Sequence, residues 1–279
     1  MSATGPGIGQ AGQARTCIDG APRNSAHTFY RDALRHLQAC GVPFLLGGAY
    51  ALSHYANVQR DTKDLDIFVR PTDCRRALDT LAQLGFRTEL TFTHWLGKAH
   101  CGEHFIDVIF SSGNGICRVD DAWFMHAVDV VVWEIPVQIV PAEEMIWSKA
   151  YIMERDRYDG ADIAHVLRAR GRDLDWPRLL ERFAGHWRVL LSHLVLFAFI
   201  YPDEPAPIPS AILHALLERA GTDITRRASS DPRCQGTLLS ILQYRDDVEG
   251  WGYRDARLPP SGTMTREEIA RWTAAFTIS

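Results

Sequence analysis

The chain has 279 residues, of which 46% are hydrophobic and 23% are charged. These values are typical of globular proteins and exclude a disordered or fibrous chain. The 30 basic and 34 acidic residues give a net charge of −4, which argues against a surface that coats duplex DNA, because such binding neutralises many phosphates.

The first 25 residues are rich in glycine, alanine and glutamine and contain no apolar run. This composition is typical of a disordered tail and not of a signal peptide. The longest apolar run, residues 189–201, is shorter than the roughly 20 residues that a membrane span needs. We therefore expect a cytoplasmic protein with no membrane contact.

The first half of the chain alternates between helix and strand signals. Apolar residues at helical spacing predict helices over residues 27–40, 49–56 and 72–84. Short apolar or alternating runs predict strands over residues 42–48, 65–69, 86–92 and 104–110, and residues 128–140 are typical of a β-hairpin or two edge strands around Pro136. We therefore predict an α/β (α+β) core with a small mixed sheet flanked by helices, over residues 26–141.

The pattern changes after residue 141, where helical periodicity takes over. It predicts helices over residues 142–158, 159–170, 176–186, 187–201 and 209–220, with shorter ones near 237–247 and 265–275. This predicts an all-helical C-terminal half over residues 142–279, whose last hundred residues carry no motif that we can assign.

Three features of the first half can carry chemistry. Gly47 and Gly48 stand where a strand runs into a helix, and free N–H groups there can hold a phosphate, although such turns often need glycine for steric reasons alone. Asp64 and Asp66 lie two apart on a strand and so project together, which favours a cation between them, most simply Mg²⁺. Asp107 is a lone acid within an apolar strand; it is either a third ligand or a residue that faces the solvent.

Together, these residues resemble the signature of the DNA polymerase β-like nucleotidyltransferase superfamily. That signature is a glycine pair at a helix start, then Asp-x-Asp on the next strand, then a third carboxylate on a later strand. The run Arg60-x-Thr62-x-Asp64-x-Asp66 further resembles an abortive-infection (AbiEii-type) and uncharacterised subset. A second segment, residues 141–167, resembles the helical part that follows the core in those proteins, and it includes Lys149, Arg157, Asp159 and Asp162.

The resemblance implies a reaction and a set of site residues. Asp64, Asp66 and Asp107 would be catalytic and would ligate two Mg²⁺ ions, with Mn²⁺ as a substitute. Gly47, Gly48, Thr62, Lys63 and Lys149 would bind the nucleotide, an NTP such as ATP. A nucleoside monophosphate would then pass to a hydroxyl of an RNA 3′ end, a protein or a small molecule, in a toxin–antitoxin or phage-defence setting that only analogy suggests.

Several alternatives stay open. Lys149 is either a phosphate ligand or an exposed helix lysine, and Asp159 and Asp162 either position Lys149 or Arg157, or cap the next helix. A catalytically degenerate binding or antitoxin module would keep the fold, but it would have no reason to keep three mutually repelling carboxylates. A metal-dependent phosphohydrolase would leave the glycine pair without a clear role. We do not expect a metal site at His100, Cys101 and His104, because the two histidines would lie about 13 Å apart along a strand.

Overall fold

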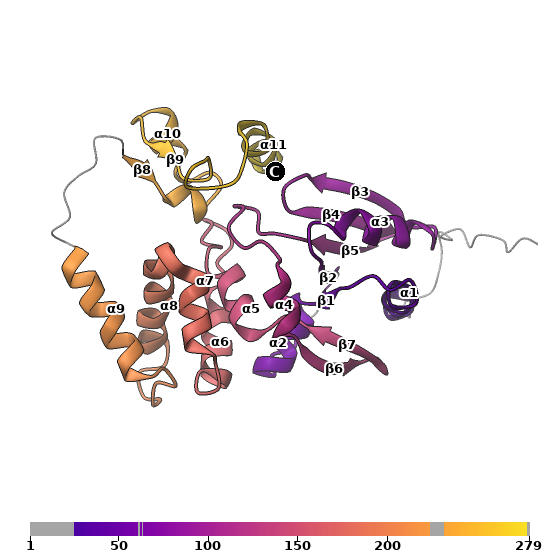
Figure 1. Cartoon of the computed structure of the whole chain (residues 1–279), viewed down its shortest axis with the longest axis horizontal. Coiled ribbons are helices and arrows are strands. Elements are labelled where there is room, and N and C mark those ends of the chain that lie inside the picture. Colours follow the sequence, from indigo (N-terminus) through magenta and orange to yellow (C-terminus); the bar gives the residue numbers. More distant parts are fainter. Residues whose placement is uncertain (1–24, 61, 63, 224–231, 278–279) are drawn as a thin grey trace, which may run out of the picture.

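The computed structural model describes residues 25–60, 62, 64–223 and 232–277. Residues 1–24, nearly all of the expected disordered tail, lie outside the described residues, as does Lys63. The fold is a mixed α/β arrangement built on a seven-stranded sheet with the strand order β3-β4-β5-β2-β1-β7-β6 (Figure 1). Its strands are β1 (Leu45–Leu46), β2 (Asp64–Phe68), β3 (Arg87–Phe92), β4 (Leu96–Cys101), β5 (His104–Ile109), β6 (Val128–Val132) and β7 (Ile135–Ile139).

Strand β2 lies in the middle of the sheet and pairs in parallel with β5, so that Asp66 stands opposite Asp107. Alternate residues of a strand point to opposite faces. Leu65 and Ile67 are fully buried on one face, which leaves Asp64 and Asp66 on the other. The alternation that is legible in the sequence therefore fixes which face of the sheet carries the acids.

The helices of the first half cover the sheet and its ends. Helix α3 packs against β3, β4 and β5, and α1 packs against α3 and the sheet. The helices are α1 (Ser25–Ala39), α2 (Gly48–Ala56), α3 (Cys74–Ala82) and α4 (Asp121–Met125). The hairpin β6–β7 turns at Trp133 and Glu134, which both have positive φ, as a tight two-residue hairpin turn requires.

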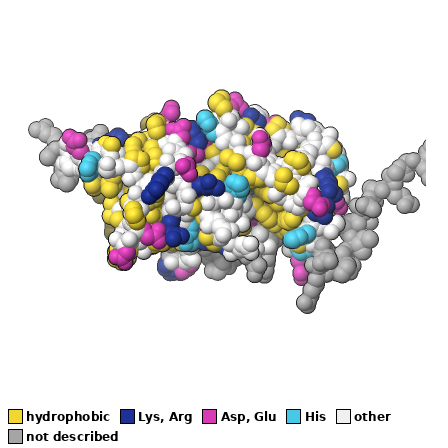
Figure 2. Space-filling view, turned by 90° about the horizontal axis from the view of Figure 1, so that it is seen from below, with side chains coloured by type: hydrophobic (Ala, Val, Ile, Leu, Met, Phe, Trp, Pro, Cys, Tyr) yellow, Lys and Arg dark blue, Asp and Glu magenta, His cyan; other side chains and the backbone are white. Residues whose placement is uncertain are grey.

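The helices of the second half pack onto the sheet domain through one continuous apolar core. They are α5 (Ala142–Lys149), α6 (Gly160–Arg170), α7 (Trp176–Phe183), α8 (Trp187–Ile200) and α9 (Ser210–Asp223), with a short 3₁₀ turn, η1 (Ala184–His186), between α7 and α8. The run Trp176–Ile200 is long and apolar enough to cross a membrane by composition alone. In this fold, Leu190, Leu194 and Phe197 of that run belong to the core, and on the face seen in Figure 2 exposed apolar side chains are interspersed with charges of both signs.

The last described segment, residues 232–277, lies above the sheet and the helices in Figure 1. It contains η2 (Gly236–Leu238), α10 (Arg245–Glu249) and α11 (Arg266–Thr277), together with two-residue strands β8 (Arg233–Cys234) and β9 (Arg254–Asp255) that pair in parallel. The C-terminal half is thus mainly, but not wholly, helical. The division of the chain at residue 141 stays a prediction.

Three parts of the chain were predicted wrongly. The helix expected near residues 237–247 is instead the short 3₁₀ turn η2 and the five-residue helix α10. Residues 96–101 form a strand, β4, that we did not predict, and Gly97, Lys98 and Ala99 have low strand propensity; pairing with both β3 and β5 holds them extended. The helix expected over residues 142–158 ends at Lys149. Beyond it the backbone forms a bridge between Met153 and Tyr158, and Met153 N donates to Leu239 O at 3.1 Å. Contacts with the distant C-terminal segment therefore override the local helical pattern.

Candidate active site

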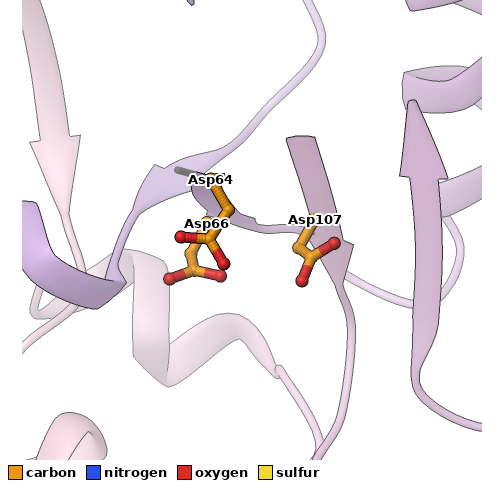
Figure 3. Close-up of side chains that lie close together, drawn as sticks. All are labelled: Asp64, Asp66 and Asp107. Carbon is orange, nitrogen blue, oxygen red and sulfur yellow. The ribbon is translucent and has the colours of Figure 1, made fainter. Parts of the chain in front are cut away.

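Three carboxylates meet on one face of the sheet. Asp64 and Asp66 come from β2 and Asp107 from β5, and one oxygen of each lies within 4.8 Å of the others (Figure 3). They are the only such group of three or more acidic, histidine or cysteine ligands in the described part of the chain. Hard oxygen donors at this spacing fit a divalent cation such as Mg²⁺.

The electrostatics of this cluster are unfavourable without a cation. Burial, followed by repulsion from Asp64 and Asp107, raises the pKa of Asp66 to about 7, although Lys149 and Arg157 oppose the shift. Burial and the charge of Asp64 also raise the pKa of Asp107, while Lys98 lowers it. Perturbed carboxylates of this kind are typical of sites that bind a metal or move protons.

The glycine pair is required by packing against the strand that carries the acids. A Cβ on Gly48 would lie 1.8 Å from Asp66 Oδ2, and one on Gly47 would lie 2.2 Å from a ring carbon of Phe68. Gly47 N donates to Asp66 O at 2.9 Å, and Gly48 has a φ of +53°. The turn thus sets the N-terminus of α2 directly against Asp66, with no acidic side chain in its first turn.

Thr62 and Lys149, both expected to bind the nucleotide, have protein partners. The Thr62 hydroxyl donates to the carboxylate of Asp64. Lys149 Nζ lies 2.7 Å from Asp159 Oδ2 and 2.8 Å from Asp162 Oδ2. Lys149 nevertheless lines the same cavity as Gly48 and Asp66, so it is a part of the site's wall and not an exposed helix lysine.

The two segments that resembled one family meet through an ion pair of Arg60 with Asp162. Arg60, which precedes Asp64 in the motif, pairs with Asp162, whose side chain is 3% exposed. Arg157 Nε donates to Asp159 Oδ1 at 3.1 Å. Asp159 occupies the N-cap position of α6 but makes no side-chain cap bond there, so the two aspartates position Lys149, Arg157 and Arg60 and do not cap the helix.

Some residues near the acids were not assigned from the sequence. Lys98 lies on β4 opposite Asp107 and binds its carboxylate. Tyr30 of α1 is buried, and burial together with the charges of the three acids raises its pKa to about 12. Tyr30 lies outside both motif segments, and only the scarcity of lysine, with three lysines in the whole chain, draws attention to Lys98.

The remaining motifs that the sequence analysis considered contribute no residue to the cluster of three carboxylates. His100 falls on β4 and His104 on β5, and Cys101 is the residue that pairs with His104. Glu143, in the Pro-x-Glu run of the second segment, accepts from Asp175 N at 2.7 Å and pairs with Arg178, so it joins α5 to α7. A separate cavity of about 580 Å³ lies between α10 and α11, and none of the predicted site residues lines it.

One family model covers more than half of the chain. The profile of a family described as uncharacterised nucleotidyltransferase matches residues 20–198. No curated protein matches the sequence.

Solved structures offer distant likenesses. One is the antibiotic-resistance factor ANT(2″)-Ia, at 15% identity and a TM-score of 0.37, over 71% of this chain and 95% of that one. A second is the lincosamide antibiotic adenylyltransferase LnuA, at 14% identity and a TM-score of 0.38, over 50% of this chain and 94% of that one. A third is an antigenic nucleotidyltransferase-like protein from Paracoccidioides brasiliensis, at 12% identity and a TM-score of 0.42, over 68% of this chain and 92% of that one.

Proposed function

Because this chain belongs to the uncharacterised nucleotidyltransferase family, we propose that it moves a nucleoside monophosphate from a Mg²⁺-bound NTP to an acceptor hydroxyl. The observation that carries the proposal is the cluster of Asp64, Asp66 and Asp107, whose oxygens lie within 4.8 Å of one another. We place it in the cytoplasm and leave the AbiEii-type subset as a hypothesis.

The residues have separate roles in this proposal. Asp64, Asp66 and Asp107 would hold two Mg²⁺ ions, which when bound stabilise the entering and leaving oxygens of an in-line displacement. Gly47 and Gly48 present the N-terminus of α2, a favourable place for phosphate oxygens. The acceptor oxygen forms the new bond to the α-phosphorus, the bond to the bridging oxygen breaks, and pyrophosphate leaves.

Lys98 and Lys149 set the charge around this reaction. Lys98 Nζ lies 2.7 Å from Asp107 Oδ1, which favours the ionised carboxylate that can accept the proton of the acceptor hydroxyl. Lys149 lies beside Asp66 and adds positive charge where the triphosphate would collect. The acceptor class, whether RNA, protein or small molecule, stays a hypothesis, as does a toxin–antitoxin or defence role.

The test is transfer of label. The full-length protein is incubated with Mg²⁺ and each α-labelled NTP in the presence of RNA, protein extract or antibiotics, and labelled products are separated. We expect label on one acceptor class with the wild type, none with Asp66→Ala, and wild-type labelling with Asp156→Asn, whose carboxylate is 82% exposed.

Two results would oppose the proposal. A double variant Asp64→Ala/Asp66→Ala that binds Mg²⁺–NTP as tightly as the wild type would show that the site assignment is wrong. Tight NTP binding without label on any acceptor would instead favour the catalytically degenerate binding module.

A further inference from the structure

A cavity of about 250 Å³ opens beside Asp66 and continues along the same face of the sheet. Phe68 and Ile109 line it, and each lies two residues beyond an acid on its strand, Asp66 and Asp107 respectively. Gly48 and Lys149 line it as well. The cavity therefore runs from the expected phosphate site toward the ends of β2 and β5.

The far wall of this cavity comes from the C-terminal segment, outside the matched range 20–198. Trp272 of α11 packs over Gly113, where a Cβ would lie 2.2 Å from Trp272 Cζ2, and its ring meets that of His94 at a centroid distance of 5.8 Å. Asn114 Nδ2 donates to Leu238 O at 2.7 Å. These buried contacts fix the segment onto the sheet domain.

The charged groups that line the cavity, apart from Asp66, are already paired. Lys149 and Arg157 both bind Asp159, and Glu154 accepts from Ile241 N at 2.8 Å and binds the Ser240 hydroxyl. The rest of the wall is largely apolar or aromatic: Trp95, Leu238, Ile241, Trp272 and Phe276. Such a wall suits a flat, neutral ring and not a polycation.

Two donors in this wall have no partner. The indole N–H groups of Trp95 and Trp272 are buried and unpaired among the described residues, and Trp272 is only 8% exposed. Buried donors without an acceptor are rare in proteins because they cost free energy.

We propose that this cavity holds the nucleobase of the NTP and that Trp272 contacts the base. The inference rests on the proposed function, because Gly48 and Lys149 at the same cavity would take the phosphates. Its volume is below the ~300–1,000 Å³ of pockets that enclose a whole drug-sized ligand, and it suits one ring system. Nucleobases are neutral, carry acceptor atoms on their edges and pack well on aromatic side chains.

The experiment compares two ligands, one with and one without the nucleoside. Binding of Mg²⁺–tripolyphosphate and of each Mg²⁺–NTP to the full chain is measured by calorimetry. For Trp272→Ala, we expect NTP affinity to fall about 5- to 150-fold while tripolyphosphate affinity is unchanged. The control is Trp251→Ala in the same segment, where the side chain is 71% exposed.

Each other outcome has a definite meaning. The base site would be overturned if Trp272→Ala lost affinity equally for both ligands or lost none for NTP. It would also be overturned if the wild type bound NTP no more tightly than tripolyphosphate. If Trp272→Ala bound NTP normally but transferred label poorly, the cavity would be assigned to the acceptor. If wild type binds neither ligand, the proposed function itself fails. Should Trp272→Ala unfold, Phe276→Ala replaces it, since that side chain also lines the cavity and is 45% exposed.

Discussion

Lys98 and Asp107 face each other across neighbouring strands, and Lys98 Nζ lies 2.7 Å from Asp107 Oδ1. Both side chains are largely buried, at 23% and 15% exposure, and the ammonium group also lies 4.4 Å from the centroid of the Phe105 ring. The third acid of the cluster thus has its own counter-ion. Among the described residues, Asp66 has no ion pair, and the two cations that lower its pKa, Lys149 and Arg157, are engaged by Asp159.

Replacing Lys98 with methionine should weaken metal binding most at low pH. Burial and Asp64 already raise the pKa of Asp107, and Lys98 holds it down, so losing the cation raises it further and leaves more of the carboxyl protonated. We expect Mn²⁺ affinity to fall about tenfold at pH 6 and to approach that of the wild type at pH 9. Calorimetric titrations across this range test it, with Lys98→Arg as the charge-keeping control; a loss that is independent of pH would contradict it.

Gly48→Ala should abolish transfer while the protein remains folded. The added Cβ would meet Asp66 Oδ2 at 1.8 Å, so the carboxylate must move. Gly102→Ala is a matched control: its φ of +59° imposes similar backbone strain, but a Cβ there meets nothing within 4 Å. The positive φ alone should cost each variant about 1 kcal/mol of unfolding free energy, and only Gly48→Ala should lose Mn²⁺ binding; equal activity in the two would show that this contact is dispensable.

The acids could be predicted because the relevant information is local. Asp64 and Asp66 share a face through the two-residue period of a strand, and Leu65 and Ile67 between and beyond them mark the buried face. Asp107 stands in an apolar run that could only be a strand. The resemblance implied only a third carboxylate on a later strand; the structure adds that this strand, β5, pairs in parallel with β2, so that Asp107 stands opposite Asp66.

The rest of the site depends on contacts between residues far apart in the chain. Lys98 sits in a stretch with weak strand propensity that pairing holds extended. Glu154 leaves the expected helix because its carboxylate binds Ser240 and Ile241. Trp272 reaches Gly113 across about 160 positions of sequence, and no periodicity in a single sequence encodes such a contact.

Asp66→Asn should stabilise the metal-free protein at neutral pH. The pKa of Asp66 is about 7 in the folded protein against 3.8 as the ordinary value, so between these values the folded state binds the extra proton and stability falls as pH rises. A shift of about three pKa units corresponds to at most about 4 kcal/mol of unfolding free energy, before screening by water and ions. The asparagine lacks this penalty.

The measurement is the difference in unfolding free energy between the two proteins in EDTA. We expect no difference near pH 4 and a growing advantage of Asp66→Asn toward pH 7.5, while added Mg²⁺ should raise the Tm of the wild type alone. An advantage that is constant with pH would mean that the charge of Asp66 is not its cause.

Lys149→Met separates a structural role of this lysine from a role in phosphate binding. Its ammonium group bridges Asp159 and Asp162 at 2.7 and 2.8 Å, and breaking a buried pair of this kind costs about 3 kcal/mol. The double variant Lys149→Met/Asp159→Asn removes one stranded charge and should recover part of that stability in urea titrations. Because the lysine also lines the cavity beside Asp66, tripolyphosphate affinity should stay low in both variants.

The control is Arg155→Met, whose pair with Asp156 is 82% exposed on both sides and should cost no more than about 1 kcal/mol. If the double variant regained phosphate affinity together with stability, Lys149 would act only by holding the two aspartates.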